Sequence, residues 1–242
     1  GCGVRSKLFE LAKSPAVLCM DCHVLLTPGS LKKLIDYYDE NPDTENLFHG
    51  PLLWEQLENK SKLKSGKKVS NISTHFDTKW RGGMWGRWSN HETLGYSIDD
   101  EPFEIPAHGM GLFSSRKDSW LGFNKHFREF GGEEVYIHEK YRQHGRKVIC
   151  LPFLRWMHRF YRPEGPPYPM STKSRLRNYI IGHMELGMNL DDMINHFISE
   201  KKVNEDDLKK ILVEVISETG YRPKFKKKKM AKTMNPFKKI KL

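Results

Sequence analysis

Residues 14–23 read SPAVLCMDCH, and this stretch decides the fold class of the chain. Ser14 and Pro15 end the helical pattern that precedes them, and residues 16–20 have the length and apolar character of a buried strand. Asp21 and His23 follow that strand directly. Because α/β proteins bind their ligands at the carboxyl ends of strands, we expect an α/β fold with a ligand site here.

The flanking segments support this expectation. A helical pattern over residues 5–13 leads into the strand, and a second helix is predicted to begin at residues 28–30 and to end near residues 41–42. A further helix is predicted from Gly131 to His144, because Gly145 is a suitable C-terminal cap. Further strands are expected at residues 46–54, 103–106, 109–114 and 147–151, and residues 58–70 read as an exposed loop.

The C-terminal part of the chain has a different character. Amphipathic helical patterns cover residues 174–186, 190–199 and 206–217, with Asn189 and Asn204 as capping candidates. We therefore predict three parts. These are a main domain over residues 1–165, a helical appendage over 166–220, and a basic, disordered tail over 221–242.

Most of the formal net charge of +11 comes from the C-terminal tail. Residues 222–242 hold ten Lys or Arg and no acid, which leaves +1 for the rest of the chain. A tail of this kind is suited to contact anionic surfaces, but the charge of the main body does not indicate nucleic-acid binding. No apolar run is long enough to cross a bilayer. We expect a cytoplasmic or membrane-peripheral protein, although the compartment stays open because Gly1 already reads as the interior of a fold.

Asp21 and His23 are candidate metal ligands. With a local turn, both side chains can reach one ion and offer a carboxylate oxygen and an imidazole nitrogen, which fits Mn²⁺ or Mg²⁺. Taken alone, this pair favours a plain strand-end loop over a metal site. Cys19 and Cys22 form a CxxC pair without the second pair that a zinc ribbon needs, so Cys19 is expected to be a small buried hydrophobe.

Four short blocks resemble a known family. They lie in the same order as in GT-A fold glycosyltransferases, and their form is most similar to the polypeptide N-acetylgalactosaminyltransferases and their family 2-like relatives. The first block is residues 3–42, which begin GVRSKLFELAKSPAVLCMDCHV and continue through LTPGSL at 26–31. The others are HGMGLFS at 108–114, FGGEE at 130–134 and WMHRF at 156–160. The resemblance covers roughly residues 3–163 and implies a GT-A-like, Rossmann-like mixed sheet flanked by helices, truncated at its N-terminus and followed by the helical appendage.

The resemblance also implies site residues. His158 would complete a metal-ligand set with Asp21 and His23. Gly109 and Gly111 would line the donor sugar. Arg5 is a candidate contact to the nucleotide-diphosphate donor. Arg159 and Arg162 can either contact the diphosphate or lie solvated on the surface. The part of the family that binds the nucleotide base lies before the segment seen here, so the donor nucleotide stays undetermined.

Glu133 and Glu134 are the candidate catalytic residues. They stand at the start of a predicted helix, where the helix dipole favours ionised carboxylates, and either one can bind an acceptor hydroxyl or act as a general base. A glutamate base would suit inversion at the sugar carbon, whereas the family resemblance suggests retention. The aromatic segment 80–88 can either cover a ligand or anchor a loop on the core. His126, His138 and His144 are expected on the surface.

We therefore expect a metal-dependent glycosyltransferase that moves a hexose or N-acetylhexosamine from a nucleotide-diphosphate donor to a hydroxyl acceptor on a glycan, a protein or another molecule. Two alternatives stay open. One is a catalytically incompetent GT-A-like binding module, and the other is a nucleic-acid-modifying glycosyltransferase.

Overall fold

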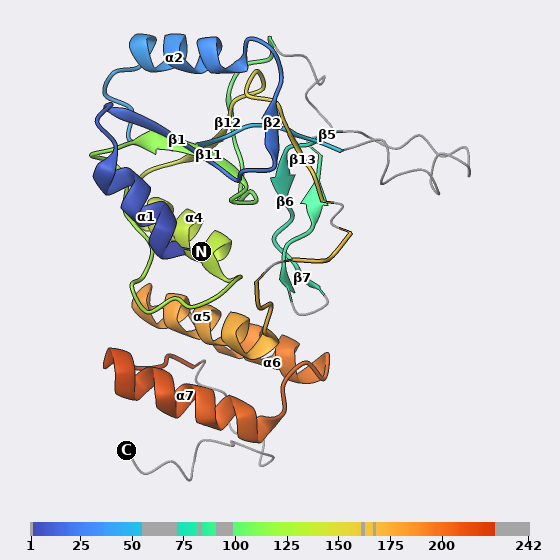
Figure 1. Cartoon of the computed structure of the whole chain (residues 1–242). Coiled ribbons are helices and arrows are strands. Elements are labelled where there is room, and N and C mark those ends of the chain that lie inside the picture. Colours follow the sequence, from blue (N-terminus) through green and yellow to red (C-terminus); the bar gives the residue numbers. More distant parts are fainter. Residues whose placement is uncertain are drawn as a thin grey trace.

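The computed structural model describes residues 2–54, 72–81, 84–90, 99–160, 163–166 and 168–225. A five-stranded mixed sheet forms the centre of the described fold (Figure 1). The neighbouring strands β12 and β3 are parallel, and the other pairs in this sheet are antiparallel. In spatial order the strands are β1 (Ala16–Met20), β11 (Leu112–Arg116), β3 (Leu47–His49), β12 (Val148–Cys150) and β10 (Phe103–Glu104).

Helices cover both faces of this sheet. Helix α2 (Ser30–Glu40) lies on one face, and α1 (Cys2–Leu11) and α4 (Glu133–Gln143) lie on the other (Figure 1). Successive strand residues point to opposite faces, so Leu112 packs with the α2 side of the core while Phe113 packs with the α1 and α4 side. Both side chains are fully buried. The sheet is therefore buried on both faces, as an α/β layer requires.

A second sheet adjoins the first. Its strands, in spatial order, are β2 (Val24–Leu26), β13 (Trp156–His158), β4 (Leu52–Leu53) and β5 (Ile72–Ser73). Residues 46–54 were predicted as one strand, but they form β3 and β4, with Gly50 and Pro51 between them. A Cβ atom at Gly50 would lie 1.6 Å from the carbonyl oxygen of Leu154, so this close backbone approach requires glycine.

Short strands form two hairpin-like pairs between the sheets and the C-terminal helices. These pairs are β6 (His75–Phe76) with β9 (Trp88–Ser89), and β7 (Trp80–Arg81) with β8 (Met84–Trp85). Trp80 and Trp85 pack against the core of the C-terminal helices. Part of the aromatic segment 80–88 therefore anchors this region on the helical core.

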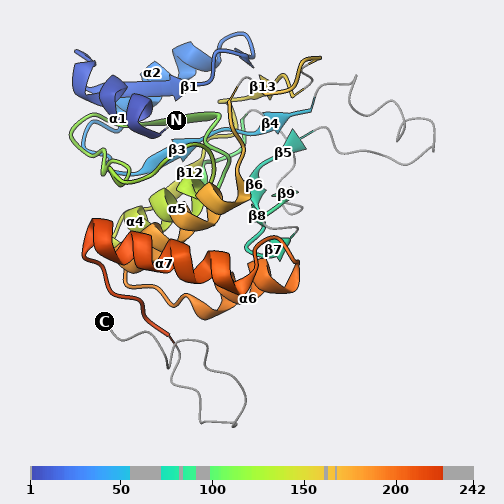
Figure 2. The ribbon, with the colours of Figure 1, turned by 60° about the horizontal axis from the view of Figure 1, so that its bottom comes forward.

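The C-terminal helices lie beneath α4 in Figure 1, and Figure 2 shows α6 and α7 below α5. They are α5 (Thr172–Glu185), α6 (Asp191–Ser199) and α7 (Glu205–Thr219). Their core includes Val135 of α4 and the fully buried Phe197. Asn204 caps α7 by accepting a hydrogen bond from the amide of Asp207. Among the described helices, none combines the length and apolar character needed to cross a membrane.

Most of the predicted elements are confirmed. The predicted helix at 131–144 is α4, and Gly145 follows it in the left-handed conformation. The fold class, a mixed α/β structure, is also confirmed. The predicted loop at 58–70, Arg162, and residues 226–242 of the predicted tail lie outside the described residues.

An ionic cluster ties α7 to the rest of the molecule. Glu218 pairs with His126 at 2.9 Å and with Arg128 at 2.7 Å, and it also accepts a hydrogen bond from the buried Arg177. The hydrogen bond from His126, together with Arg177 and Arg128, lowers the pKa of Glu218 to about 2.

The lowered pKa predicts a pH-dependent contribution of Glu218 to stability. This contribution is complete above the ordinary glutamate pKa of about 4.5 and is lost as the pH falls toward 2. We expect Glu218→Gln to lower the melting temperature by roughly 2–4 °C near neutral pH, and this difference from the wild type should shrink as the pH falls below about 4.5. Glu10→Gln, at an exposed carboxylate of α1, is the control. A difference that does not change with pH would contradict a role for the charge of Glu218.

Candidate functional site

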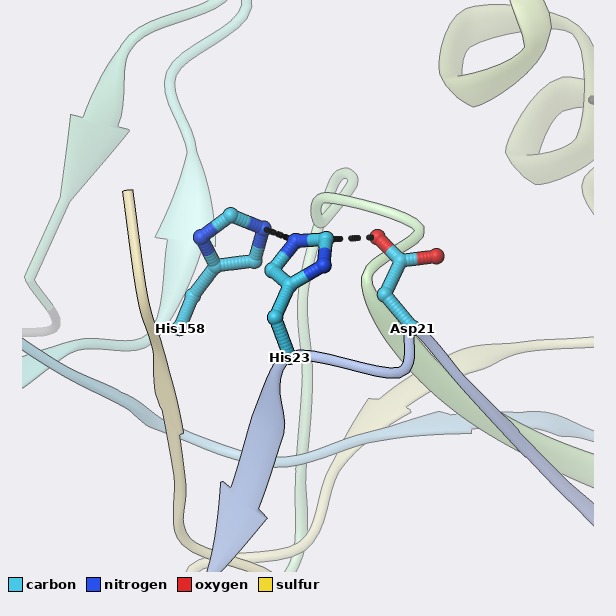
Figure 3. A group of neighbouring side chains, drawn as sticks. All are labelled: Asp21, His23 and His158. Atoms are coloured by element: carbon cyan, nitrogen blue, oxygen red, sulfur yellow. Dashed lines mark hydrogen bonds and ion pairs between the residues drawn. The ribbon is translucent and has the colours of Figure 1, made fainter. Parts of the chain in front are cut away.

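Three predicted metal ligands lie together at the junction of the two sheets. Asp21 follows β1, His23 precedes β2, and His158 ends β13, and their side chains point toward one another (Figure 3). The Nε2 atoms of His23 and His158 are 2.8 Å apart, and His23 Nε2 is 4.0 Å from a carboxylate oxygen of Asp21. One ligand atom of each residue lies within 4.8 Å of the others. One oxygen and two imidazole nitrogens at these distances fit a divalent cation such as Mn²⁺ or Zn²⁺.

Strand register explains how residues so distant in sequence meet. Strands β2 and β13 are antiparallel, and His158 pairs with Val24, the residue after His23. The amide of Arg159 also donates to the carbonyl of His23 at 3.3 Å. The imidazoles of His23 and His158 are thus placed side by side by backbone pairing, so no unusual loop is needed.

Arg5 connects the three candidate metal ligands to α4, the helix that carries the candidate catalytic glutamates. Its guanidinium is 3.1 Å from a carboxylate oxygen of Asp21 and 3.5 Å from one of Glu133. Burial opposes the charge of Arg5, but Glu133 and Asp21 raise its pKa above the ordinary arginine value. Arg5 therefore stays charged and holds the two carboxylates near each other.

A glycine turn directs the two candidate catalytic glutamates. Gly131 and Gly132 have φ values of 97° and 95°, in the left-handed region that favours glycine. The side-chain amide of Asn178, on α5, donates to the carbonyl of Gly131 at 2.8 Å. A Cβ atom at Gly132 would lie 3.0 Å from that of Asn178. Helix α5 thus supports the turn from which Glu133 and Glu134 project.

The two glutamates have different surroundings. Glu133 is buried, and its Oε2 atom has no hydrogen-bond partner among the described residues. Glu134 is half-buried, and burial together with the nearby Glu133 raises its pKa to about 8. An orphaned buried carboxylate oxygen requires a hydrogen-bond donor, which a ligand hydroxyl can provide. A carboxylate with a raised pKa is suited to accept a proton near neutral pH.

Gly109 and Gly111 also line the site. The carbonyl of Gly111 accepts a hydrogen bond from the amide of Asp21 at 2.9 Å. A Cβ atom at Gly111 would lie 3.1 Å from the ring of Trp156 and 3.3 Å from that of His158. A Cβ atom at Gly109 would lie 2.7 Å from the Trp88 ring. A side chain at Gly109 would displace the Trp88 ring, and one at Gly111 would require Trp156 or His158 to shift by a few tenths of an ångström.

These residues surround one pocket of about 370 Å³. Seven of the predicted site residues line it, namely Arg5, Asp21, Gly109, Gly111, Glu133, Glu134 and His158. His23 is not one of the lining residues, but it contacts His158, which does line the pocket. Arg159 is exposed and lies outside the lining, and Arg162 is outside the described residues.

The apolar wall of this pocket was predicted only in part. It contains Phe76, Met84, Trp88, Phe130, Trp156, Phe160, Tyr168 and Met170. Met84 and Trp88 belong to the aromatic segment 80–88, for which contact with a ligand was one of two predicted roles, whereas Trp156 and Phe160 belong to a block identified by family resemblance. The aromatic and methionine content of residues 156–170 was the available signal, but sequence alone did not place it beside Glu134.

The prediction that His138 lies on the surface is wrong. His138 is fully buried, and its Nε2 atom is 2.9 Å from that of the fully buried His49. The Nδ1 atom of His138 contacts the carbonyl of Glu134 at 2.5 Å, and that of His49 contacts the carbonyl of Leu112 at 3.0 Å. Burial lowers the pKa of both imidazoles, so they are neutral. His138 occupies the buried face of α4, next to Ile137.

Comparison with known proteins supports the fold. No family model matches the chain, and no curated protein matches it. A solved structure described as "Crystal structure of GalNAc-T7 with UDP, GalNAc and Mn2+" superposes with a TM-score of 0.58 and 16% identity. The match covers 90% of this chain and 43% of that chain, so this chain spans less than half of that protein's length. The chain therefore has a GT-A glycosyltransferase fold, as the sequence blocks indicated.

The ligand geometry predicts direct metal binding. Titration with Mn²⁺, followed by the loss of the free-ion electron paramagnetic resonance signal, should show one bound ion per chain. We expect His158→Ala and His23→Ala to weaken binding by at least roughly 100-fold, because each removes one of three protein ligands. His144→Ala, at an exposed histidine of the α4 C-terminus, should bind as the wild type does. Equal affinity in all four proteins would contradict the site.

Proposed function

We propose that this protein is a metal-dependent glycosyltransferase that moves a sugar from a nucleotide-diphosphate donor to a hydroxyl acceptor. The observation that carries the proposal is that Asp21, His23 and His158 gather beside Glu133 and Glu134. This arrangement combines a potential metal site with carboxylates suited to proton transfer. The GT-A fold and the similarity to a structure that holds UDP, GalNAc and Mn²⁺ support the same reaction class.

Cleavage of a sugar–phosphate bond leaves negative charge on the diphosphate. A divalent cation held by Asp21, His23 and His158 would neutralise that charge as a Lewis acid. Arg5 keeps Asp21 in place through the 3.1 Å ion pair, so the carboxylate is ordered before any ligand binds. Such preorganisation lowers the cost of assembling the site during the reaction.

Glu133 and Glu134 have separate roles in this proposal. Arg5 neutralises Glu133, whose orphaned Oε2 atom is suited to accept a hydrogen bond from a donor-sugar hydroxyl. Glu134 has no ion-pair partner among the described residues, and its raised pKa suits a general base. Glu134 would take the proton of the acceptor hydroxyl while that oxygen attacks the anomeric carbon and the diphosphate leaves. Attack from the face opposite the leaving group inverts the anomeric carbon.

Hydrolysis of the donor tests the metal site in this proposal. A panel of nucleotide sugars that includes UDP-GalNAc should yield at least one donor that is hydrolysed with Mn²⁺ and not with a chelator. We expect Asp21→Ala and His158→Ala to lower the rate by at least about 100-fold, because the leaving group loses its counter-charge. His144→Ala is the control. Equal hydrolysis by both site variants and the wild type would refute the metal role.

The pH dependence of transfer tests Glu134. Because burial and Glu133 raise the pKa of Glu134, the fraction of the active carboxylate form, and hence the transfer rate, should rise with pH through the neutral range. We expect Glu134→Gln to lower kcat by roughly 10²–10⁴-fold and to abolish this rise, while Mn²⁺ binding persists. The same pH rise in the variant would exclude Glu134 as the base. Nuclear magnetic resonance of the product should report inversion.

A further inference from the structure

Exposed apolar side chains gather around the mouth of the pocket. Met84, Phe160, Tyr168 and Met170 line the pocket, and each is between 37% and 46% exposed. They come from separate parts of the chain: β8, the residues after β13, and the segment before α5. Chain segments that are distant in sequence thus meet to form an apolar rim on a pocket whose lining also contains polar side chains. An exposed apolar set of this kind indicates a binding surface.

Contacts with neighbouring aromatic rings fix the positions of the aromatic residues of the rim. Tyr168 contacts Phe130, with ring centroids 5.7 Å apart, and Phe160 stacks on Trp54 at 5.2 Å. Deeper in the pocket, Phe76 and Trp88 form an edge contact at 4.3 Å. Packing thus fixes the orientation of these flat apolar rings. A ligand can therefore bind to them with little rearrangement of the side chains.

The charges of the pocket favour a neutral acceptor. Among the described lining residues, Arg5 is the one arginine or lysine, and Asp21 and Glu133 already neutralise it. Glu133 and Glu134 offer carboxylate oxygens, which accept hydrogen bonds from hydroxyl groups. Phosphates or carboxylates of an acceptor would be repelled by these carboxylates. This arrangement disfavours nucleic acids and acidic peptides.

The size of the pocket limits the ligand further. Its volume of about 370 Å³ lies near the lower end of the range of roughly 300–1,000 Å³ for small-molecule sites. It therefore suits a small cyclic ligand better than a long acyl chain. A sugar ring combines apolar C–H faces, which pack on aromatic rings, with hydroxyl donors for the carboxylates.

We infer that the acceptor is a neutral carbohydrate whose terminal ring lies against Tyr168 and Phe130, with a hydroxyl directed toward Glu134. As an acceptor role, this inference rests on the proposed transferase function. Binding of the carbohydrate itself does not require donor, metal or turnover, so the two can be tested separately.

The test is direct binding of the 242-residue chain to an array that carries neutral mono- to tetrasaccharides and serine- or threonine-containing peptides. A salt concentration of about 0.3 M screens the attraction of anionic ligands to this basic protein. We expect binding to one or more neutral saccharides. Tyr168→Ala should weaken that binding by about tenfold or more, and Tyr168→Phe should keep it within about twofold, because the ring provides the contact. Val213→Ala, at an exposed apolar residue of α7, should have no effect.

Binding to peptides and to no saccharide would overturn the inference, as would equal saccharide binding by Tyr168→Ala and the wild type. Melting curves of each variant establish that it is folded. Asp21→Asn separates this inference from the proposed function, since it should lose metal-dependent donor hydrolysis but keep saccharide binding. If the wild type binds saccharides but hydrolyses no donor, the result would contradict the transferase proposal. It would still support the carbohydrate site.

Discussion

The ion pairs of Arg5 with Asp21 and Glu133 connect the parts of the site. Asp21 ends a strand of the central sheet, Glu133 begins α4 on one face of that sheet, and Arg5 comes from α1. Asp21 is half-buried and Glu133 is buried, and the guanidinium compensates the negative charge of both. Arg5 therefore ties the end of β1, α1 and the start of α4 into one group.

The remaining scaffold keeps this arrangement in place. Backbone pairing between β2 and β13 sets His158 beside His23, and the carbonyl of Gly111 accepts a hydrogen bond from the amide of Asp21. Asn178 of α5 supports the turn before Glu133. The buried pair of His49 and His138 links the first turn of α4 to the central sheet through backbone carbonyls. The C-terminal helical layer therefore contributes to the site, although it lies beneath α4 and away from the metal ligands.

Sequence reasoning succeeded where the signal was local. The strand before Asp21 is a short apolar run, the helix after Gly29 has a clear apolar period, and the helix between Gly132 and Gly145 has clear end signals. Gly50-Pro51 was a local signal for the break within residues 46–54, but the close approach of Leu154 to Gly50 cannot be read from the sequence. His138 was misplaced because a polar residue on a helix was assumed to be exposed, and its partner His49 is 89 residues away in sequence.

For the candidate site, too, local motifs could be recognised in the sequence and contacts between distant segments could not. Short motifs identified Asp21, His23, Glu133 and Glu134, and family resemblance added His158, which strand pairing brings beside His23. The bridging role of Arg5 and the aromatic wall required the three-dimensional arrangement. Both depend on contacts between distant segments, and no periodicity or motif encodes such contacts.

The central claim is that Asp21, His23 and His158 bind one metal ion that a nucleotide sugar also contacts. Crystals grown with Mn²⁺ and a nucleotide sugar, with anomalous diffraction recorded near the manganese absorption edge, test it most directly. We expect a single strong anomalous peak about 2 Å from the Nε2 atoms of His23 and His158, with diphosphate oxygens completing the coordination. No anomalous peak at this position, with the direct contact between the two imidazoles retained, would contradict it.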